Sequence, residues 1–249
     1  MKAKDRIILA LDVNTEDEAI DLVETLQGHV GVFKVGMELY TAVGPGIVKR
    51  IQDLGGSVFV DLKFHDIPNT VASAGRVMTR LGCAMFTVHA AGGGAMLSAL
   101  SEAVREEAET LGVKPPLILA VTVLTSIDQQ ILEDDLFIKG LSVKDAAVRW
   151  ARLARDSGIG GVICSPLETT AIRAACGPEF RLVTPGIRPH WAGKHDQRRV
   201  TTPGEAVRGG ADYIVVGRAI TRAADPVSAA KLIAEEIEEV VGERDVDQR

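Results

Sequence analysis

Charged side chains of both signs lie close together near the end of one apolar run of the sequence. Asp61, Lys63 and Asp66 stand within residues 59–70, and Lys34 stands inside a second apolar run. Side chains two residues apart in a strand share a face, so a strand here would point Asp61 and Lys63 the same way. On a neighbouring strand, Lys34 would reach the same space. This grouping predicts a charged pocket.

A structural ion-pair network is the alternative explanation for these charges. Opposite charges about 4 Å apart gain roughly 4 kcal/mol at an effective dielectric constant of 20, which could hold such a cluster together. Buried ion pairs can nevertheless often be replaced by apolar packing without loss of stability. Because Asp12 adds another charge at the end of a further apolar run, we interpret the set as functional.

Two segments in the second half of the chain carry features of an anion-binding site. Residues 184–188 read Thr-Pro-Gly-Ile-Arg, and residues 215–218 read Val-Val-Gly-Arg. Glycine allows backbone N–H groups to approach an anion, and arginine adds a bidentate pair of donors. Either segment alone fits a plain turn with a solvated arginine as well as it fits an anion-binding site. Together they predict a phosphate site.

The other polar candidates carry weaker signals. The run His89–Gly94 looks like a phosphate cradle but lacks the Lys-Ser/Thr ending of a triphosphate-binding loop. We interpret it as a turn from a strand into a helix, with His89 as a polar core residue. Thr125 follows another apolar run, where its hydroxyl either meets ligand or caps a helix. The five histidines show no metal-ligand spacing, so no metal site is predicted.

A polar stretch follows the first of the two anion-binding segments. Residues 189–199 include His190, His195 and Gln197. A long polar connection beside a ligand site is typical of a loop that closes over the ligand. We therefore interpret this stretch as a lid.

Eight short, mostly aliphatic runs alternate with helical patterns along the chain. The runs are Arg6–Asp12, Val32–Gly36, Ser57–Phe64, Met85–Ala90, Leu117–Leu124, Gly161–Ser165, Arg181–Gly186 and Tyr213–Arg218. Between them, apolar residues recur with helical spacing. Capping signals predict helix starts at Thr15, Ser142, Ser165–Pro166 and Asp225–Pro226.

The alternation of strands and helices predicts the fold class. Parallel strands joined by right-handed crossovers form either a closed (β/α)8 barrel or an open doubly wound sheet. Eight strands favour the closed (β/α)8 TIM barrel, and without a linker or composition shift we expect a single domain over residues 1–249. Active sites of such barrels lie at the carboxyl ends of the strands, where the polar residues above are found.

Composition excludes several classes of protein. The 249 residues carry a net charge of −6, which argues against broad nucleic-acid binding. No apolar stretch is long enough to span a bilayer, and no cleavable signal pattern is present. The three cysteines lack metal or redox spacing and suit buried, reduced thiols. We expect a cytoplasmic protein without membrane or nucleic-acid partners.

Taken together, the motifs resemble the orotidine 5′-phosphate decarboxylase family. The matching segments are Ala10–Asp12, Phe33–Gly36, Asp61–Thr70, Leu124–Ser126, Thr184–Arg188 and Val216–Arg218, in that order along nearly the whole chain. The Asp-x-Lys-x-x-Asp element alone is shared with sugar-phosphate relatives. Asp-Ile-Pro-Asn-Thr, Thr-Pro-Gly-Ile-Arg and Gln197 are specific to the decarboxylase.

The resemblance implies a role for each matched residue. The catalytic residues would be Lys34, Asp61, Lys63 and Asp66, with Lys63 giving a proton to C6 of the pyrimidine as carbon dioxide is lost. The substrate-binding residues would be Asp12 and Lys34 at the ribose, Asp61, Thr70, Thr125, Gln197 from the lid, and Arg188, Gly217 and Arg218 at the 5′-phosphate. Asp66 and Thr70 would reach the neighbouring site of a homodimer.

The resemblance further implies that orotidine 5′-phosphate is converted to UMP without a cofactor or metal, in de novo pyrimidine biosynthesis. A metal-dependent relative acting on a sugar phosphate is one alternative. A nucleotide-binding module without catalysis is another, although the complete charged set argues against it.

Overall fold

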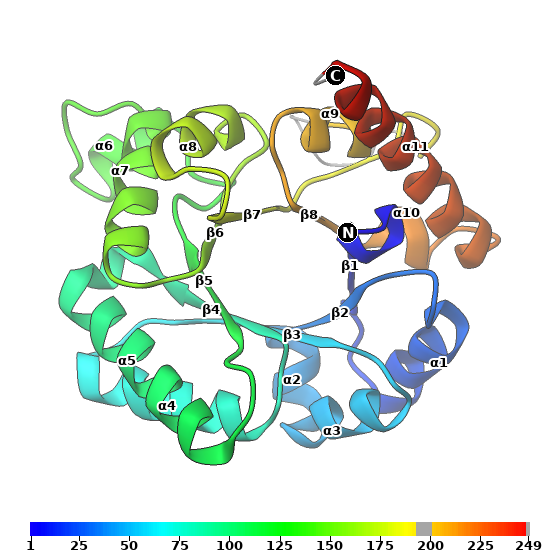
Figure 1. Cartoon of the computed structure of the whole chain (residues 1–249), viewed down its shortest axis with the longest axis horizontal. Coiled ribbons are helices and arrows are strands. Elements are labelled where there is room, and N and C mark those ends of the chain that lie inside the picture. Colours follow the sequence, from blue (N-terminus) through cyan, green and yellow to red (C-terminus); the bar gives the residue numbers. More distant parts are fainter. Residues whose placement is uncertain (193–200, 248–249) are drawn as a thin grey trace. The chain divides into compact units, whose positions relative to one another are not determined.

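The computed structural model describes residues 1–192 and 201–247 of the chain. Its eight parallel strands follow one another in the order β1 to β8 around a closed barrel (Figure 1). The strands are β1 Ile7–Ala10, β2 Val32–Gly36, β3 Val58–Phe64, β4 Met85–His89, β5 Leu117–Val121, β6 Gly161–Ile163, β7 Arg181–Thr184 and β8 Tyr213–Val216. The predicted (β/α)8 barrel is confirmed, and the open doubly wound sheet is wrong.

Helices alternate with the strands in the order expected for this fold. They are α1 Glu16–Leu26, α2 Met37–Val43, α3 Gly46–Asp53, α4 Pro68–Arg80, α5 Gly93–Leu111, α6 Gln129–Asp134, α7 Val143–Asp156, α8 Thr169–Cys176, α9 Pro203–Arg208, α10 Arg218–Thr221 and α11 Pro226–Asp247. Two short 3₁₀ helices, η1 Ala3–Arg6 and η2 Ala90–Gly92, precede β1 and α5.

Several strands are shorter than their apolar runs. The fifth run was expected to reach Leu124, but β5 ends at Val121. The next residue, Thr122, is still buried, and both its N–H and its hydroxyl donate to the carbonyl of Ile163. Here apolar character continues past the last residue of the ladder, because Thr122 and Val123 at the start of the loop after β5 are also buried.

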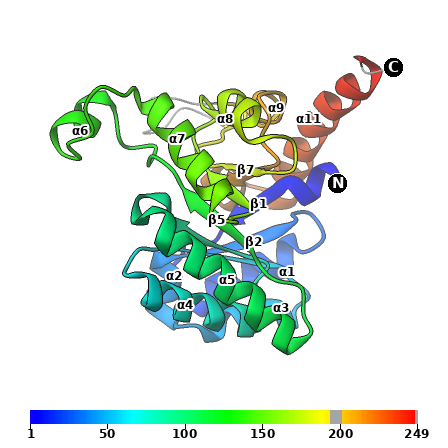
Figure 2. The same ribbon diagram turned by 60° about the vertical axis from the view of Figure 1, so that its left-hand side comes forward.

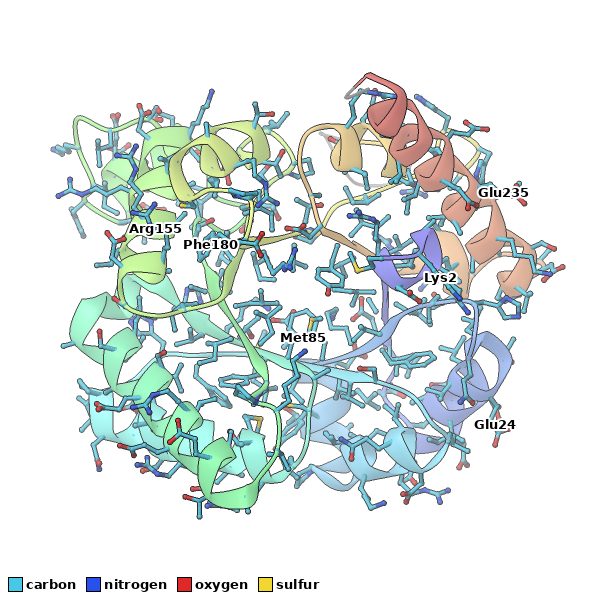
Figure 3. All side chains as sticks on the ribbon, in the orientation of Figure 1. Lys2, Glu24, Met85, Arg155, Phe180 and Glu235 are labelled. Atoms are coloured by element: carbon cyan, nitrogen blue, oxygen red, sulfur yellow. The ribbon has the colours of Figure 1, made fainter. Side chains whose placement is uncertain are left out.

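The chain forms two compact units, of which the first comprises Met1–Asp61 and Thr184–Arg249. In this unit β1 pairs in parallel with both β2 and β8, and β2 pairs with β3. Helix α11 packs against α9 and η1. The labelled Glu24 and Glu235 extend from exposed faces of α1 and α11 (Figure 3). The aromatic rings of Phe33 and Phe59 are fully buried.

The second unit comprises Leu62–Val183. Its strands β4 to β7 pair in sequence order. Helices α4 and α5 lie side by side in both views (Figures 1 and 2). A side chain at Gly75 on α4 would collide with Leu100 and Val104 on α5, so glycine at this position permits the close approach.

Most predicted helix starts are confirmed. The hydroxyl oxygens of Thr15 and Ser142 accept the N–H of the residue three positions later, and Asp225 caps α11 through Ser228. The start predicted at Ser165–Pro166 is wrong because α8 begins at Thr169.

Two capping interactions differ from the prediction: one closes a turn in place of starting a helix, and the other was not predicted. Glu168 turns its carboxylate back to accept the Ser165 N–H, closing a turn ahead of α8. A capping box that was not predicted joins Thr202 and Glu205 at the start of α9.

The three cysteines are free and buried, as expected. Burial raises the pKa of Cys83 to about 12, so this thiol is unreactive at neutral pH. Within the described residues, the helices include none that combines the length and apolar character needed to cross a bilayer.

Candidate active site

In the first unit, a buried lysine lies between two carboxylates at the strand ends. Lys34 Nζ is 3.2 Å from Asp12 Oδ1 and 3.9 Å from Asp61 Oδ2. The strand register explains this grouping, because Ala10 pairs with Lys34 and Gly36 pairs with Asp61. Three of the predicted site residues are therefore brought together.

The burial of the three groups differs. The side chains of Lys34 and Asp61 are 11% and 16% exposed, whereas that of Asp12 is 61% exposed. A lysine removed from water needs negative partners, which the two aspartates provide. Because Asp12 remains open to solvent, its carboxylate is available to a ligand hydroxyl while it holds the ammonium group.

Two glycines leave room beside this ion pair. A β-carbon at Gly36 would lie 3.0 Å from Lys34 Nζ and 3.8 Å from Asp12 Oδ1. A β-carbon at Gly217 would lie 3.7 Å from Asp12 Oδ2. Gly217, at the end of β8, is thus placed beside Asp12 at the end of β1 in the same unit.

The two predicted phosphate-binding arginines have different surroundings. Arg188 Nε donates to the carbonyl of Ala192 at 2.9 Å, and its backbone N–H donates to that of Thr201 at 3.0 Å. A β-bridge between Ile187 and Thr201 flanks this contact. Arg218 is exposed at the start of α10.

In the second unit, Lys63 has an unusual backbone. Its φ is 55°, in the left-handed region that residues other than glycine rarely adopt. Its N–H donates to the hydroxyl oxygen of Thr87 on β4 at 2.8 Å. The simple two-residue repeat that predicted a common face for Asp61 and Lys63 therefore does not extend through Lys63, because that repeat requires extended backbone.

The segment after β3 is exposed from His65 to Thr70. Asp66 Oδ1 accepts the N–H of Ile67 at 2.6 Å, which fixes the carboxylate beside its own loop. Ile67 is 66% exposed. Thr70 lies on the exposed first turn of α4.

A pair of histidine rings follows β3 and β4. The ring centroids of His65 and His89 are 5.4 Å apart. His89 is half-buried rather than fully buried, so its assignment to the core is only partly right. The predicted turn over His89–Gly94 is confirmed, because η2 leads there from β4 into α5.

The remaining predicted residues fall in loops. Thr125 is exposed and does not cap a helix, since Asp128 caps α6 through the N–H of Ile131. The alternative role of Thr125 as a cap is therefore wrong. His195 and Gln197 lie outside the described residues, as does most of the predicted lid.

The sequence reasoning missed the buried Thr87, and it paired Glu168 with Ser165 as a capping residue without foreseeing that Glu168 is buried. Thr87 is fully buried on β4, where its only sequence signal was a hydroxyl in an otherwise apolar run. Glu168 is also buried, and desolvation raises the pKa of its carboxyl to about 7, partly opposed by the hydrogen bond from the Ser165 N–H. Its spacing had suggested a capping residue.

Metal-ligating side chains do not cluster in the part of the chain that the structure describes. Over residues 1–192 and 201–247, His, Cys, Asp and Glu form no group of three that could hold an ion.

Comparison with known proteins places this architecture in a family. The family model described as orotidine 5′-phosphate decarboxylase / HUMPS family matches residues 5–233. An orotidine 5′-phosphate decarboxylase of Syntrophomonas wolfei is 59% identical over 239 residues, covering 96% of this chain and 100% of that protein. One from Moorella thermoacetica is 55% identical and covers 96% of this chain and 95% of its own length.

A solved structure agrees with the sequence comparisons. The crystal structure of orotidine 5′-phosphate decarboxylase from Lactobacillus acidophilus is 37% identical, with a TM-score of 0.82, and the match covers 93% of this chain and 98% of that one. The chain belongs to the orotidine 5′-phosphate decarboxylase / HUMPS family.

Proposed function

We propose that this protein is a cofactor-independent carboxy-lyase that converts orotidine 5′-phosphate to UMP and carbon dioxide in pyrimidine biosynthesis. The observation that carries the proposal is the 59% identity to a decarboxylase over 96% of the chain. The Asp12–Lys34–Asp61 cluster and Lys63, which stands two residues after Asp61 in β3, supply charged groups suited to that reaction.

The reaction needs positive charge and a proton at one carbon. When the bond from C6 to the carboxylate breaks, its electron pair stays on C6, and no adjacent carbonyl can take up the charge. In our proposal the Lys63 ammonium stabilises this carbanion and transfers a proton to C6, forming the C–H bond of UMP. The neutral amine then regains a proton from water.

The aspartates and Lys34 have complementary roles in the proposed mechanism. Asp12 and Lys34 bind the ribose hydroxyls, a role supported by the exposure of Asp12 and by its 3.2 Å contact with Lys34. Asp61 also contacts the substrate. In the series Lys34, Asp61, Lys63 and Asp66, positive and negative charges alternate. Preorganised charges of this kind cost no reorganisation during the reaction.

The rest of the substrate is bound away from the reacting carbon. We assign the 5′-phosphate to Arg188, Arg218 and the N–H of Gly217, and place Thr125 and Gln197 near the ligand. Arginine suits this role because its planar fork binds phosphate oxygens in pairs. Binding energy from the phosphate can then help to align the reacting end of the substrate.

We also propose a homodimer in which Asp66 and Thr70 reach the neighbouring active site. The exposure of Ile67 between them supports this arrangement, because an apolar side chain at 66% exposure gains by burial against a partner. We further propose that residues 1–249 form one barrel domain. The protein is proposed to be cytoplasmic, without nucleic-acid or membrane partners, as its buried free cysteines suit a reducing compartment.

The direct test is the loss of orotidine 5′-phosphate absorbance when purified protein is added with excess EDTA. Formation of UMP at the same rate as substrate loss supports the proposal. Activity that requires added metal and acts on a sugar phosphate would instead indicate a relative of the metal-dependent type. Tight UMP binding without turnover of either substrate would indicate a binding module.

A further inference from the structure

We infer that Thr87 is a positioning residue for Lys63, acting through the backbone of the lysine. The inference rests on the proposed function of Lys63 as proton donor. Thr87 lies on β4 and is fully buried. Its hydroxyl oxygen accepts the N–H of Lys63 at 2.8 Å.

The first argument is the conformation of Lys63. A left-handed backbone costs a residue with a β-carbon about 1–2 kcal/mol, and such conformations persist only where surrounding structure holds them. The φ of 55° at Lys63 is therefore maintained by contacts. The N–H of the strained residue itself donates the hydrogen bond to Thr87. The bond therefore acts directly on the peptide unit that sets the direction of the lysine side chain.

The second argument is the choice of threonine on β4. The neighbours of Thr87 in this strand are Phe86 and Val88, and both are fully buried. Valine has almost the same shape as threonine and the same preference for strands, so packing alone does not require a hydroxyl here. A buried hydroxyl is costly unless it is hydrogen-bonded, and the Lys63 N–H provides such a bond.

The test separates the hydroxyl from the methyl group of Thr87. Thr87→Val keeps the shape and removes the acceptor, whereas Thr87→Ser keeps the acceptor and removes the methyl group. We expect Thr87→Val to lower kcat for orotidine 5′-phosphate roughly ten-fold or more, the effect of leaving one N–H without its partner. Thr87→Ser should stay within about three-fold of the wild type.

Binding should respond differently from turnover. The affinity for UMP, measured by calorimetry, should change by less than about three-fold in Thr87→Val, since the hydrogen bond acts on the lysine that transfers the proton. Thr79→Val is the matched control, because Thr79 is buried in the same unit and donates instead to Gly75 O within α4. Its kcat should remain near the wild-type value.

A second measurement tests the contact independently of activity. With 15N-labelled lysine, amide hydrogen exchange at Lys63 should accelerate in Thr87→Val and remain slow in Thr87→Ser. If the wild type does not convert orotidine 5′-phosphate but exchange follows this pattern, the proposed function fails while the contact stands. If turnover is normal and exchange does not change, the positioning role is overturned.

Other results would also overturn the inference. An unchanged kcat in Thr87→Val would show that the hydroxyl is not needed. A loss of kcat in Thr87→Ser or Thr79→Val as large as that in Thr87→Val would indicate a general effect of packing. If Thr87→Val fails to fold, Thr87→Cys compared with Thr87→Ser tests the same point, because both variants lack the methyl group and the thiol sulfur is a poor acceptor. A Thr87→Cys protein with full kcat would again contradict the role of the hydroxyl.

Discussion

Lys34 Nζ lies 3.2 Å from Asp12 Oδ1, with the buried member of the pair on β2 and the exposed member just beyond β1. The ammonium group therefore reaches from the interior towards the solvent-facing carboxylate. Such a pair contributes modestly to stability, because one partner remains hydrated. Its geometry matters more for the placement of charge at the strand ends.

Replacing Gly36 with alanine should disturb this pair without unfolding the protein. The backbone φ of Gly36 is −88°, which alanine adopts freely, and the nearest obstacle is the mobile end of Lys34 at 3.0 Å. We expect Gly36→Ala to displace the ammonium group and lower kcat/KM roughly ten-fold, as for the loss of one charge-assisted hydrogen bond.

Steady-state kinetics and circular dichroism provide the measurement for this variant. Gly46→Ala is the control, because an added β-carbon there meets nothing within 4 Å. Wild-type kinetics in Gly36→Ala would show that the position of the Lys34 ammonium group does not limit the reaction.

Two substitutions of Lys63 should separate catalysis from backbone strain. Both Lys63→Ala and Lys63→Gly should nearly abolish turnover, because each removes the proposed proton donor. Relative to alanine, glycine avoids the cost of about 1–2 kcal/mol for a left-handed residue. It also lowers the stability of the folded protein by about 0.5–1 kcal/mol, because glycine makes the unfolded chain more flexible. We expect Lys63→Gly to be about 0.5–1 kcal/mol more stable than Lys63→Ala in urea unfolding.

The order should reverse at a helical lysine. Lys231 is exposed in the interior of α11, so Lys231→Gly should be less stable than Lys231→Ala by about 1 kcal/mol. Equal or greater stability of Lys63→Ala would contradict the strain assigned to this site, and wild-type turnover in either Lys63 variant would remove the lysine from its role.

Removing Arg218 should weaken recognition of the phosphate specifically. We expect Arg218→Ala to raise KM for orotidine 5′-phosphate and the dissociation constant for UMP by about ten- to one-hundred-fold, the usual range for charged hydrogen bonds. Binding of uridine, which lacks the phosphate, should not change. Arg222→Ala, an exposed neighbour, serves as the control. An equal loss of uridine affinity would place Arg218 elsewhere than at the phosphate.

The buried carboxyl of Glu168 should make stability depend on pH. Burial raises its folded-state pKa from the ordinary 4.5 to about 7, so the folded protein binds a proton that the unfolded chain releases. Its contribution is complete below about pH 4 and is lost as the pH rises through 7. Between these two pH ranges, the contribution of Glu168 to the free energy of unfolding falls by about 3 kcal/mol.

Glu168→Gln should remove this contribution, since its side-chain oxygen can still accept the Ser165 N–H. Urea unfolding at pH 4.5 and pH 8 should show a smaller loss of stability in the variant than in the wild type. Glu102→Gln, on an exposed face of α5, should behave like the wild type. Parallel profiles for wild type and Glu168→Gln would contradict the raised pKa.

Local sequence signals predicted much of this fold. The eight aliphatic runs identify all eight strands because parallel strands buried on both faces need continuous apolar residues. Thr15, Ser142 and Asp225 identify helix starts because a side-chain oxygen satisfies a free N–H there. The grouping of Asp12, Lys34 and Asp61 followed from the tendency of strand ends to meet at one edge.

The failures arose where tertiary structure overrides local pattern. Ser165 and Glu168 have the spacing of a helix start, yet their bond closes a turn before α8. The left-handed backbone of Lys63 has no signature in residue type, because glycine or asparagine would be the usual choice. The role of Thr87 depends on a contact 24 residues away in sequence, which periodicity does not encode.

The bridge between Ile187 and Thr201 has a consequence for protein engineering. Together with the hydrogen bond from the Arg188 N–H to the Thr201 carbonyl, it links Arg188 to Thr202, the residue that caps α9. Redesign of the Thr202–Glu205 capping box would therefore also disturb the position of Arg188, so the start of α9 is a poor place for substitutions meant to leave the site intact.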